Sequence, residues 1–174
     1  LAESSDQFSC EQGDIRTVSF GKKFDAVVSF FHVMSYQVSN TDVNAVFSNA
    51  SKHLKKGGLF IFDFWYQPAV LSQIPENRLK KMSMGDVTIS RVAEPMMFPN
   101  ENRVDVNYTI FVADVKQNKF GEISECHSMR YFSLPEIDLF CKINGFKRIQ
   151  AEEFESGKAP STDTWGVCVI LEKL

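Results

Sequence analysis

The stretch that decides the fold is Phe24–Phe31, with the sequence FDAVVSFF. It is a nearly continuous apolar run, typical of a parallel β-strand that is buried on both faces. Apolar residues then recur at helical spacing after Ser39 and Asp42, which make a capping-box-like start, and we expect this helix to end at Gly57-Gly58. The next run, Leu59–Trp65 (LFIFDFW), predicts a second buried strand. The segment therefore predicts the strand–helix–strand crossover of a parallel α/β sheet.

Different patterns lie on either side of this unit. Upstream, Phe8–Ile15 (FSCEQGDI) predicts a further short strand that ends at Gly13-Asp14. Downstream, prolines and alternating polar and apolar residues are typical of antiparallel strands with one solvated face. The strands expected there are Val87–Val92, Arg103–Val112 and Glu122–Phe132, with turns at residues 100–102 and 118–121.

The last part of the chain returns to the α/β pattern. A capping box at residues 133–136 starts a helix, and Asn144-Gly145 is expected to end it. Phe146–Phe154 and Trp165–Leu171 then predict two closing strands. We therefore expect an α/β core made of residues 1–66 and 133–174, into which an antiparallel accessory sheet, residues 67–132, is inserted.

The composition argues against several classes of function. A chain of 174 residues with a formal net charge of −3 has no basic surplus for nucleic acid, so we expect no nucleic-acid partner. The four cysteines have no C-x-x-C spacing, which disfavours a metal site of the zinc type. No apolar run approaches the roughly 20 residues of a membrane span, so we expect no membrane partner and a cytoplasmic location.

Three stretches together resemble the class I S-adenosylmethionine-dependent methyltransferases. They are QGDIR at Gln12–Arg16, FDAVVSFFHVMSY at Phe24–Tyr36 and HLKKGGLFIFDFW at His53–Trp65, and they keep that family's order and spacing. His127–Phe146 also resembles the family's late strand–helix–turn. The inserted sheet and the FDFWY run look similar to small-molecule N-methyltransferases that dimethylate the amino group of deoxyaminosugars. The resemblance implies a Rossmann-like sheet, S-adenosylmethionine as the cofactor and a small-molecule acceptor.

The resemblance also implies a cofactor site. Asp14 and Ile15 stand where the family's acidic and apolar pair holds the adenine, and a carboxylate after a strand's carboxyl end faces the crevice where α/β ligands bind. Ser29, Phe30 and Phe31 stand at the end of the family's fourth strand, whose backbone lines the methionine portion. From the residues alone, the alternatives are that Asp14 is a plain turn residue and that the phenylalanines only pack in the core.

An acceptor would lie at the rim just beyond that strand. His32 could take a proton from an ammonium acceptor, and the Tyr36 hydroxyl could orient the amine, so these two are the candidate catalytic residues. The alternative is that alignment alone suffices and His32 lines the pocket. Further candidates for acceptor binding are Trp65 and Tyr66 as an apolar wall, and His127 and Arg130 from the last accessory strand. His53 is expected to be a capping or surface residue.

One feature of the family is absent from the chain. No glycine-rich G-x-G-x-G turn precedes a helix, so the first strands and this cofactor motif are expected upstream of Leu1, and the chain is expected to be a fragment. We expect a methyltransferase acting on a nitrogen or oxygen of a small polar metabolite, with an aminosugar as one candidate. The alternative is a non-catalytic methyltransferase-like binding or assembly module, and a homodimer is left open. A nucleotide-dependent oxidoreductase has no dinucleotide fingerprint to support it.

Overall fold

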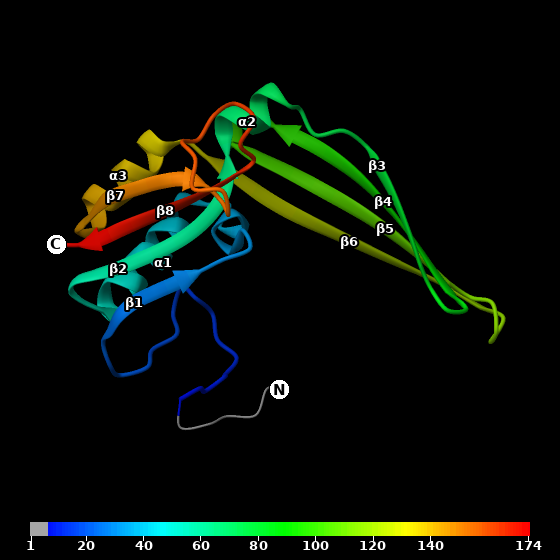
Figure 1. Ribbon diagram of the computed structural model, residues 1–174, viewed down its shortest axis with the longest axis horizontal. Helices are drawn as coiled ribbons and strands as arrows, with labels where there is room; N and C mark the ends of the chain where they lie inside the picture. Colours follow the sequence, from blue (N-terminus) through cyan, green and yellow to red (C-terminus); the bar gives the residue numbers. More distant parts are fainter. Residues whose placement is uncertain (1–6) are drawn as a thin grey trace.

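The structure, a computed structural model, describes residues 7–174. An α/β body carries a long antiparallel ribbon that extends away from it (Figure 1). The strands of the described residues form one continuous sheet in the order β3-β4-β5-β6-β2-β8-β7, and β1 pairs with the other part of β2. This confirms a mixed α/β fold with a Rossmann-like sheet and an antiparallel accessory sheet.

The predicted crossover is present. Strands β1 (Phe24–Ser29) and β2 (Leu54–Tyr66) pair in parallel, and helix α1 (Asn40–His53) connects them after the short 3-10 helix η1 (Val33–Tyr36). The Ser39 side chain accepts a hydrogen bond from the Asp42 amide, as the capping box predicts.

The prediction that α1 continues to Gly57-Gly58 is wrong. The helix ends at His53, and β2 begins at once because Leu54 already pairs with Phe24 of β1. Two lysines bind backbone carbonyls at this end: Lys173 Nζ donates to the Leu54 carbonyl at 2.9 Å, and Lys23 Nζ donates to the Lys52 carbonyl at 3.2 Å.

The closing elements also match the prediction. Helix α3 (Leu134–Asn144) begins at Ser133, whose hydroxyl accepts from the Glu136 amide, and it ends at Gly145 in the left-handed conformation with φ 73°. Strand β8 (Gly166–Lys173) lies antiparallel to β2, and β7 (Phe146–Glu153) lies outside β8.

The accessory ribbon is a four-stranded antiparallel meander. Its strands are β3 (Arg78–Met84), β4 (Val87–Phe98), β5 (Arg103–Asp114) and β6 (Lys119–Phe132). Three were predicted, with shorter bounds, and β3 was missed because its sequence RLKKMSM does not alternate and every residue is exposed. Helix α2 (Gln67–Ser72), also missed, precedes β3, and η2 (Pro99–Glu101) joins β4 to β5.

The ribbon and the body share hydrogen bonds. The end of β6 pairs in parallel with the end of β2, Tyr131 opposite Trp65 and Phe132 opposite Tyr66. Two apolar clusters lie on either side of this junction. One surrounds Phe47 under α1 and α3, and the other contains Val70, Val104, Val106 and Tyr131. Because the sheet is continuous, the division of the chain at residues 66 and 133 stays a proposal.

The prediction of a strand at Phe8–Ile15 is wrong. Only Phe8 forms an isolated bridge, and residues 9–14 have no regular structure. In the described part of the chain, β1 pairs with no strand other than β2, so this segment has no partner strand beside which to extend. It instead folds as a loop over α1 and the outer edge of β1.

Candidate functional site

The candidate site lies at the carboxyl ends of β1 and β2. These two parallel strands end at the same edge of the sheet, at Ser29 and Tyr66, and η1 follows β1 directly. In an open α/β sheet this edge is where ligands bind. The elements that reach it are the β1–η1 turn, the end of β2, the start of β8 and one face of the accessory ribbon.

His32 is fixed by a buried carboxylate on β2. Phe31 and His32 both have positive φ angles, 64° and 62°, which is an unusual turn for side-chain-bearing residues. The fully buried Asp63 supports this turn, because its two oxygens accept from the His32 amide at 3.0 and 3.1 Å. The same carboxylate lies 2.7 Å from His32 Nδ1.

The contact involves one ring nitrogen of the imidazole. Nδ1 is buried and lies within ion-pair distance of the Asp63 carboxylate, but it makes no hydrogen bond of regular geometry within the described residues. The His32 side chain is 35% exposed, so part of the ring is open to solvent. Sequence reasoning missed Asp63, although an acid inside the apolar run LFIFDFW signals a buried charge that needs a partner.

A second histidine contacts the other candidate catalytic residue. The Tyr36 hydroxyl lies 2.7 Å from His127 Nδ1, and His127 Nε2 lies 3.2 Å from a Glu125 carboxylate oxygen. The ring of Tyr108 packs edge-on against His127 with centroids 5.3 Å apart. Burial, with smaller contributions from Tyr108 and Glu125, raises the pKa of Tyr36 above its usual value, so the hydroxyl stays protonated. The structure therefore brings together two residues predicted to share one mouth.

Trp65 lies beside His32 at the same edge, whereas Tyr66 packs against the hydrophobic core. The Trp65 ring lies 6.4 Å from the His32 ring and 5.5 Å from Trp165, edge-on in both contacts. Gly166 allows this arrangement, because a Cβ there would lie 3.3 Å from His32 Cε1. Tyr66 packs against the core cluster under α1 and α3.

Arg130 does not reach this mouth, contrary to expectation. Successive strand residues point to opposite faces, so Arg130 lies on the other face of β6 from His127. Its guanidinium is buried and donates to the Val38 carbonyl, to Asn40 Oδ1 and to Glu136 Oε1. These contacts join the ribbon to the starts of α1 and α3.

The expected adenine residues lie in the loop over α1. Arg16 binds the Asp14 carboxylate through its backbone amide and its guanidinium, which lowers the pKa of Asp14 to about 2. Asn49 Nδ2 holds the loop from below by donating to the carbonyls of Ile15 and Val18 at 2.9 and 3.0 Å.

His53 completes this attachment and is not a surface residue. It is 8% exposed, its Nε2 accepts from the Phe20 amide, and its Nδ1 lies 2.9 Å from the Asn49 carbonyl. The prediction failed because the position at a helix C-terminus gave no sign that residues 15–20 fold back over it.

An apolar cavity of about 290 Å³ lies between this loop, β1 and α1. Ile15 and Ser29 line it, together with Asn49 and Phe60. The other expected cofactor residues lie outside it: Asp14 is beside Ile15 in the loop, Phe30 packs 5.7 Å from Phe154, and the Phe31 side chain is 79% exposed.

Other kinds of site find no support in the part of the chain that the structure describes. Within residues 7–174, no group of three or more His, Cys, Asp or Glu side chains could hold a metal ion. None of the described helices is long and apolar enough to cross a membrane.

The fold and the sequence of the chain can be compared with those of known proteins. Residues 1–62 match the family described as a methyltransferase domain. The fold of the chain is shared with solved structures of S-adenosylmethionine-dependent methyltransferases. A solved structure of such an enzyme from Clostridium acetobutylicum superposes with a TM-score of 0.75 at 22% identity, over 95% of this chain and 63% of that one.

Some of the similar proteins are methyltransferases that act on amino sugars. The chain is 27% identical over 149 residues to a dTDP-3-amino-3,4,6-trideoxy-α-D-glucopyranose N,N-dimethyltransferase of Streptomyces venezuelae. The aligned region covers 84% of this chain and 60% of the relative. A structure of an S-adenosylmethionine-bound amino pentose methyltransferase from Micromonospora echinaspora has a TM-score of 0.71 at 19% identity, over 93% of this chain and 63% of that one. The chain thus spans about three fifths of these proteins.

Replacing Asn49 with alanine should release the loop that carries Asp14 and Ile15. Two hydrogen bonds to backbone carbonyls are lost, so amide hydrogen exchange in residues 14–20 should accelerate at least about tenfold. Asn44→Ala, on the same helix but bonded to Asn144, should leave these amides unchanged. Equal exchange in the wild type and in Asn49→Ala would mean that the loop is held by other contacts.

Proposed function

We propose that the chain carries out methyl transfer from S-adenosylmethionine to the nitrogen of a small amine. The observation that carries the proposal is the pair of carboxylate-supported imidazoles at one sheet edge, His32 with Asp63 and His127 with Glu125. An amine acceptor is mostly an ammonium ion at neutral pH and must lose a proton before its lone pair can react. A supported imidazole supplies the base for that step.

The residues at the edge fit the cofactor. S-adenosylmethionine supplies a methyl group that its sulfonium already activates. The cavity lined by Ile15 and Ser29 is apolar and suits a planar base, and the neighbouring Asp14 carboxylate, ionised at every working pH, can accept from an exocyclic amine. The backbone of Phe30 and Phe31 lies between this cavity and His32, where the methionine portion would lie.

The chain's own residues would first remove a proton from the acceptor. His32 takes the proton from the acceptor's ammonium group directly, or the protonated Tyr36 hydroxyl accepts it while giving its own proton to His127 Nδ1. Tyr36 and His32 would hold the freed lone pair of the acceptor in line with the methyl group that S-adenosylmethionine supplies. Trp65 and Trp165 provide an apolar wall that limits water at this point.

The acceptor class follows from the relatives. The two curated relatives are N,N-dimethyltransferases of dTDP-linked amino sugars. We propose an amino sugar as the acceptor, with nitrogen in preference to oxygen because an imidazole at neutral pH deprotonates an ammonium ion far more readily than an alcohol.

The first experiment is calorimetric titration of S-adenosylhomocysteine into the full-length gene product. Asp14→Asn should weaken binding at least about fivefold, since an amide replaces a charged acceptor. Because Arg16 holds the pKa of Asp14 at about 2, below the ordinary value, the carboxylate's contribution is complete above about pH 4 and is lost only as the pH falls toward 2. Binding should therefore not change through Asp14 between pH 5 and 8, and unchanged binding by Asp14→Asn would reject its role.

A further inference from the structure

Arg78, Lys80 and Arg91 lie on the face of the ribbon that carries His127. In the regular register of the ribbon, Tyr108 lies opposite Glu125 and Ala93, and Ile110 lies opposite Arg91, which in turn lies opposite Lys80. Because side chains alternate along each strand, Arg91 and Lys80 share a face with Tyr108 and His127, as does Arg78 opposite Ala93.

Arg91 is tied to the catalytic edge by a chain of contacts. Its guanidinium lies 5.0 Å from the centroid of the Tyr108 ring, Tyr108 packs on His127, and His127 contacts the Tyr36 hydroxyl. Arg91 Nε is buried and has no hydrogen-bond partner among the described residues. A buried donor without a partner needs an acceptor, and a ligand beside Arg91 can supply one.

The charges around Arg91 point to the sign of that ligand. Lys80 and Arg91 are like charges directly opposite one another, an arrangement that is destabilising unless an anion lies between them. Within residues 7–174 no carboxylate pairs with either side chain, and the acid nearest in the register, Glu125, is engaged by His127. Arg130, the residue expected to bind an anion, is already occupied by Glu136.

We infer that Arg91 and Lys80 form a subsite for the diphosphate of a nucleotide-linked acceptor. The Arg91 guanidinium, held over the Tyr108 ring, presents its donors in the fork that phosphate oxygens accept, and the exposed Lys80 adds a second charge opposite it. The subsite orients the carrier so that the attached amine reaches Tyr36 and His32. The inference rests on the proposed function, because it names the part of the acceptor that this same edge recognises.

The test is binding of thymidine diphosphate, compared with thymidine and with inorganic pyrophosphate. Thymidine diphosphate should bind at least about tenfold more tightly than thymidine, and Arg91→Gln should remove most of that difference. Lys80→Gln should weaken thymidine diphosphate binding about threefold, and Arg91→Lys should fall between wild type and Arg91→Gln.

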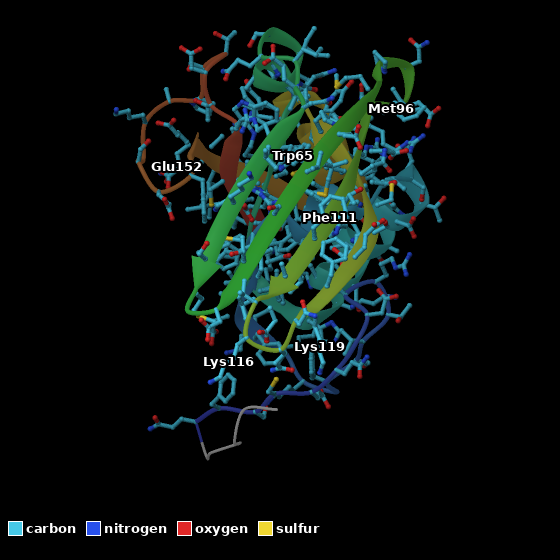
Figure 2. The ribbon with its side chains drawn as sticks, turned by 90° about the vertical axis from the view of Figure 1, so that its right-hand side faces the viewer. Trp65, Met96, Phe111, Lys116, Lys119 and Glu152 are labelled. Atoms are coloured by element: carbon cyan, nitrogen blue, oxygen red, sulfur yellow. The ribbon has the colours of Figure 1, made fainter. Side chains whose placement is uncertain are left out.

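Two lysines serve as matched controls. Lys81 neighbours Lys80 in the same strand but lies on the opposite face, opposite Ser90. Lys116 lies with Lys119 at the far turn between β5 and β6, well away from Trp65 (Figure 2). Lys81→Gln and Lys116→Gln should each change binding less than twofold. Thermal melts establish that each variant is folded.

The outcomes separate this inference from the methyl-transfer proposal. Equal affinity for thymidine and thymidine diphosphate, an equal loss in Lys81→Gln, or no binding of thymidine diphosphate would each overturn the subsite. S-adenosylhomocysteine is titrated into the same samples. Failure of that titration alone would reject the proposed function and leave the anion subsite standing.

Discussion

Replacing Asp63 with alanine is expected to lower the free energy of unfolding by about 2–3 kcal/mol. The variant loses the acceptor for the His32 amide and the support for two consecutive left-handed residues, and it leaves a cavity in β2. The estimate is below that for a fully buried ion pair because His32 is 35% exposed. Urea unfolding followed by circular dichroism measures the change.

The companion variants give this prediction its specificity. Asp25→Ala removes a carboxylate that is 86% exposed and bonded to Lys55, and it should change stability by less than about 0.5 kcal/mol. Asp63→Asn keeps the shape and an acceptor oxygen for the His32 amide, so it should retain most of the stability and still lose turnover, because a neutral amide no longer stabilises the positive charge that forms when His32 takes a proton. If Asp63→Ala were as stable as Asp25→Ala, Asp63 would not hold the turn.

Replacing Tyr36 with phenylalanine is expected to lower kcat by about a hundredfold, with a smaller effect on KM. The change deletes the hydroxyl that contacts both His127 and, in our proposal, the acceptor's nitrogen. His127→Gln should cause a similar loss, and Glu125→Gln a loss of about tenfold, since it only orients the imidazole. Initial rates at saturating cofactor measure these effects.

The pH profile adds an independent check on Tyr36. Burial raises its pKa above the ordinary value, so the hydroxyl ionises later than a free tyrosine as the pH rises. The wild-type rate should therefore not fall through Tyr36 between pH 8 and 9.5. Tyr131→Phe is the control, because the Tyr131 hydroxyl is buried without a partner among the described residues. A loss in Tyr131→Phe equal to that in Tyr36→Phe would point to packing instead of proton transfer.

Local signals predicted most of the α/β body. The Ser39–Asp42 and Ser133–Glu136 capping boxes and Gly145 act through hydrogen bonds and backbone angles within a few residues, so the sequence shows them directly. The Phe8–Ile15 strand failed because a strand needs a neighbour, and β1 offers none there within the described residues. Strand β3 was missed for the opposite reason: pairing with β4 imposes a conformation that its own residues do not indicate.

The candidate site was predictable only in part. His32, Tyr36 and His127 were identified because their types and their places after strands suggested chemistry, and the structure adds the contact between Tyr36 and His127. The place of Arg91 depends on the register between β4 and β5, which no local pattern reports, whereas Asp63 in its apolar run and Glu125, two residues before His127, left local signals that were missed. The prediction for Arg130 failed because Arg130 lies three residues after His127. Residues an odd number apart on a strand point to opposite faces of the sheet.

The most direct test of the central claim is methyl transfer itself. The full-length gene product is incubated with S-adenosylmethionine labelled in the methyl group and with a dTDP-linked amino sugar, and the label is located by mass spectrometry. We predict label on the amino nitrogen, reduced at least a hundredfold in His32→Ala/Tyr36→Phe with S-adenosylhomocysteine binding unchanged. Binding of both ligands with no transfer of label would contradict the account.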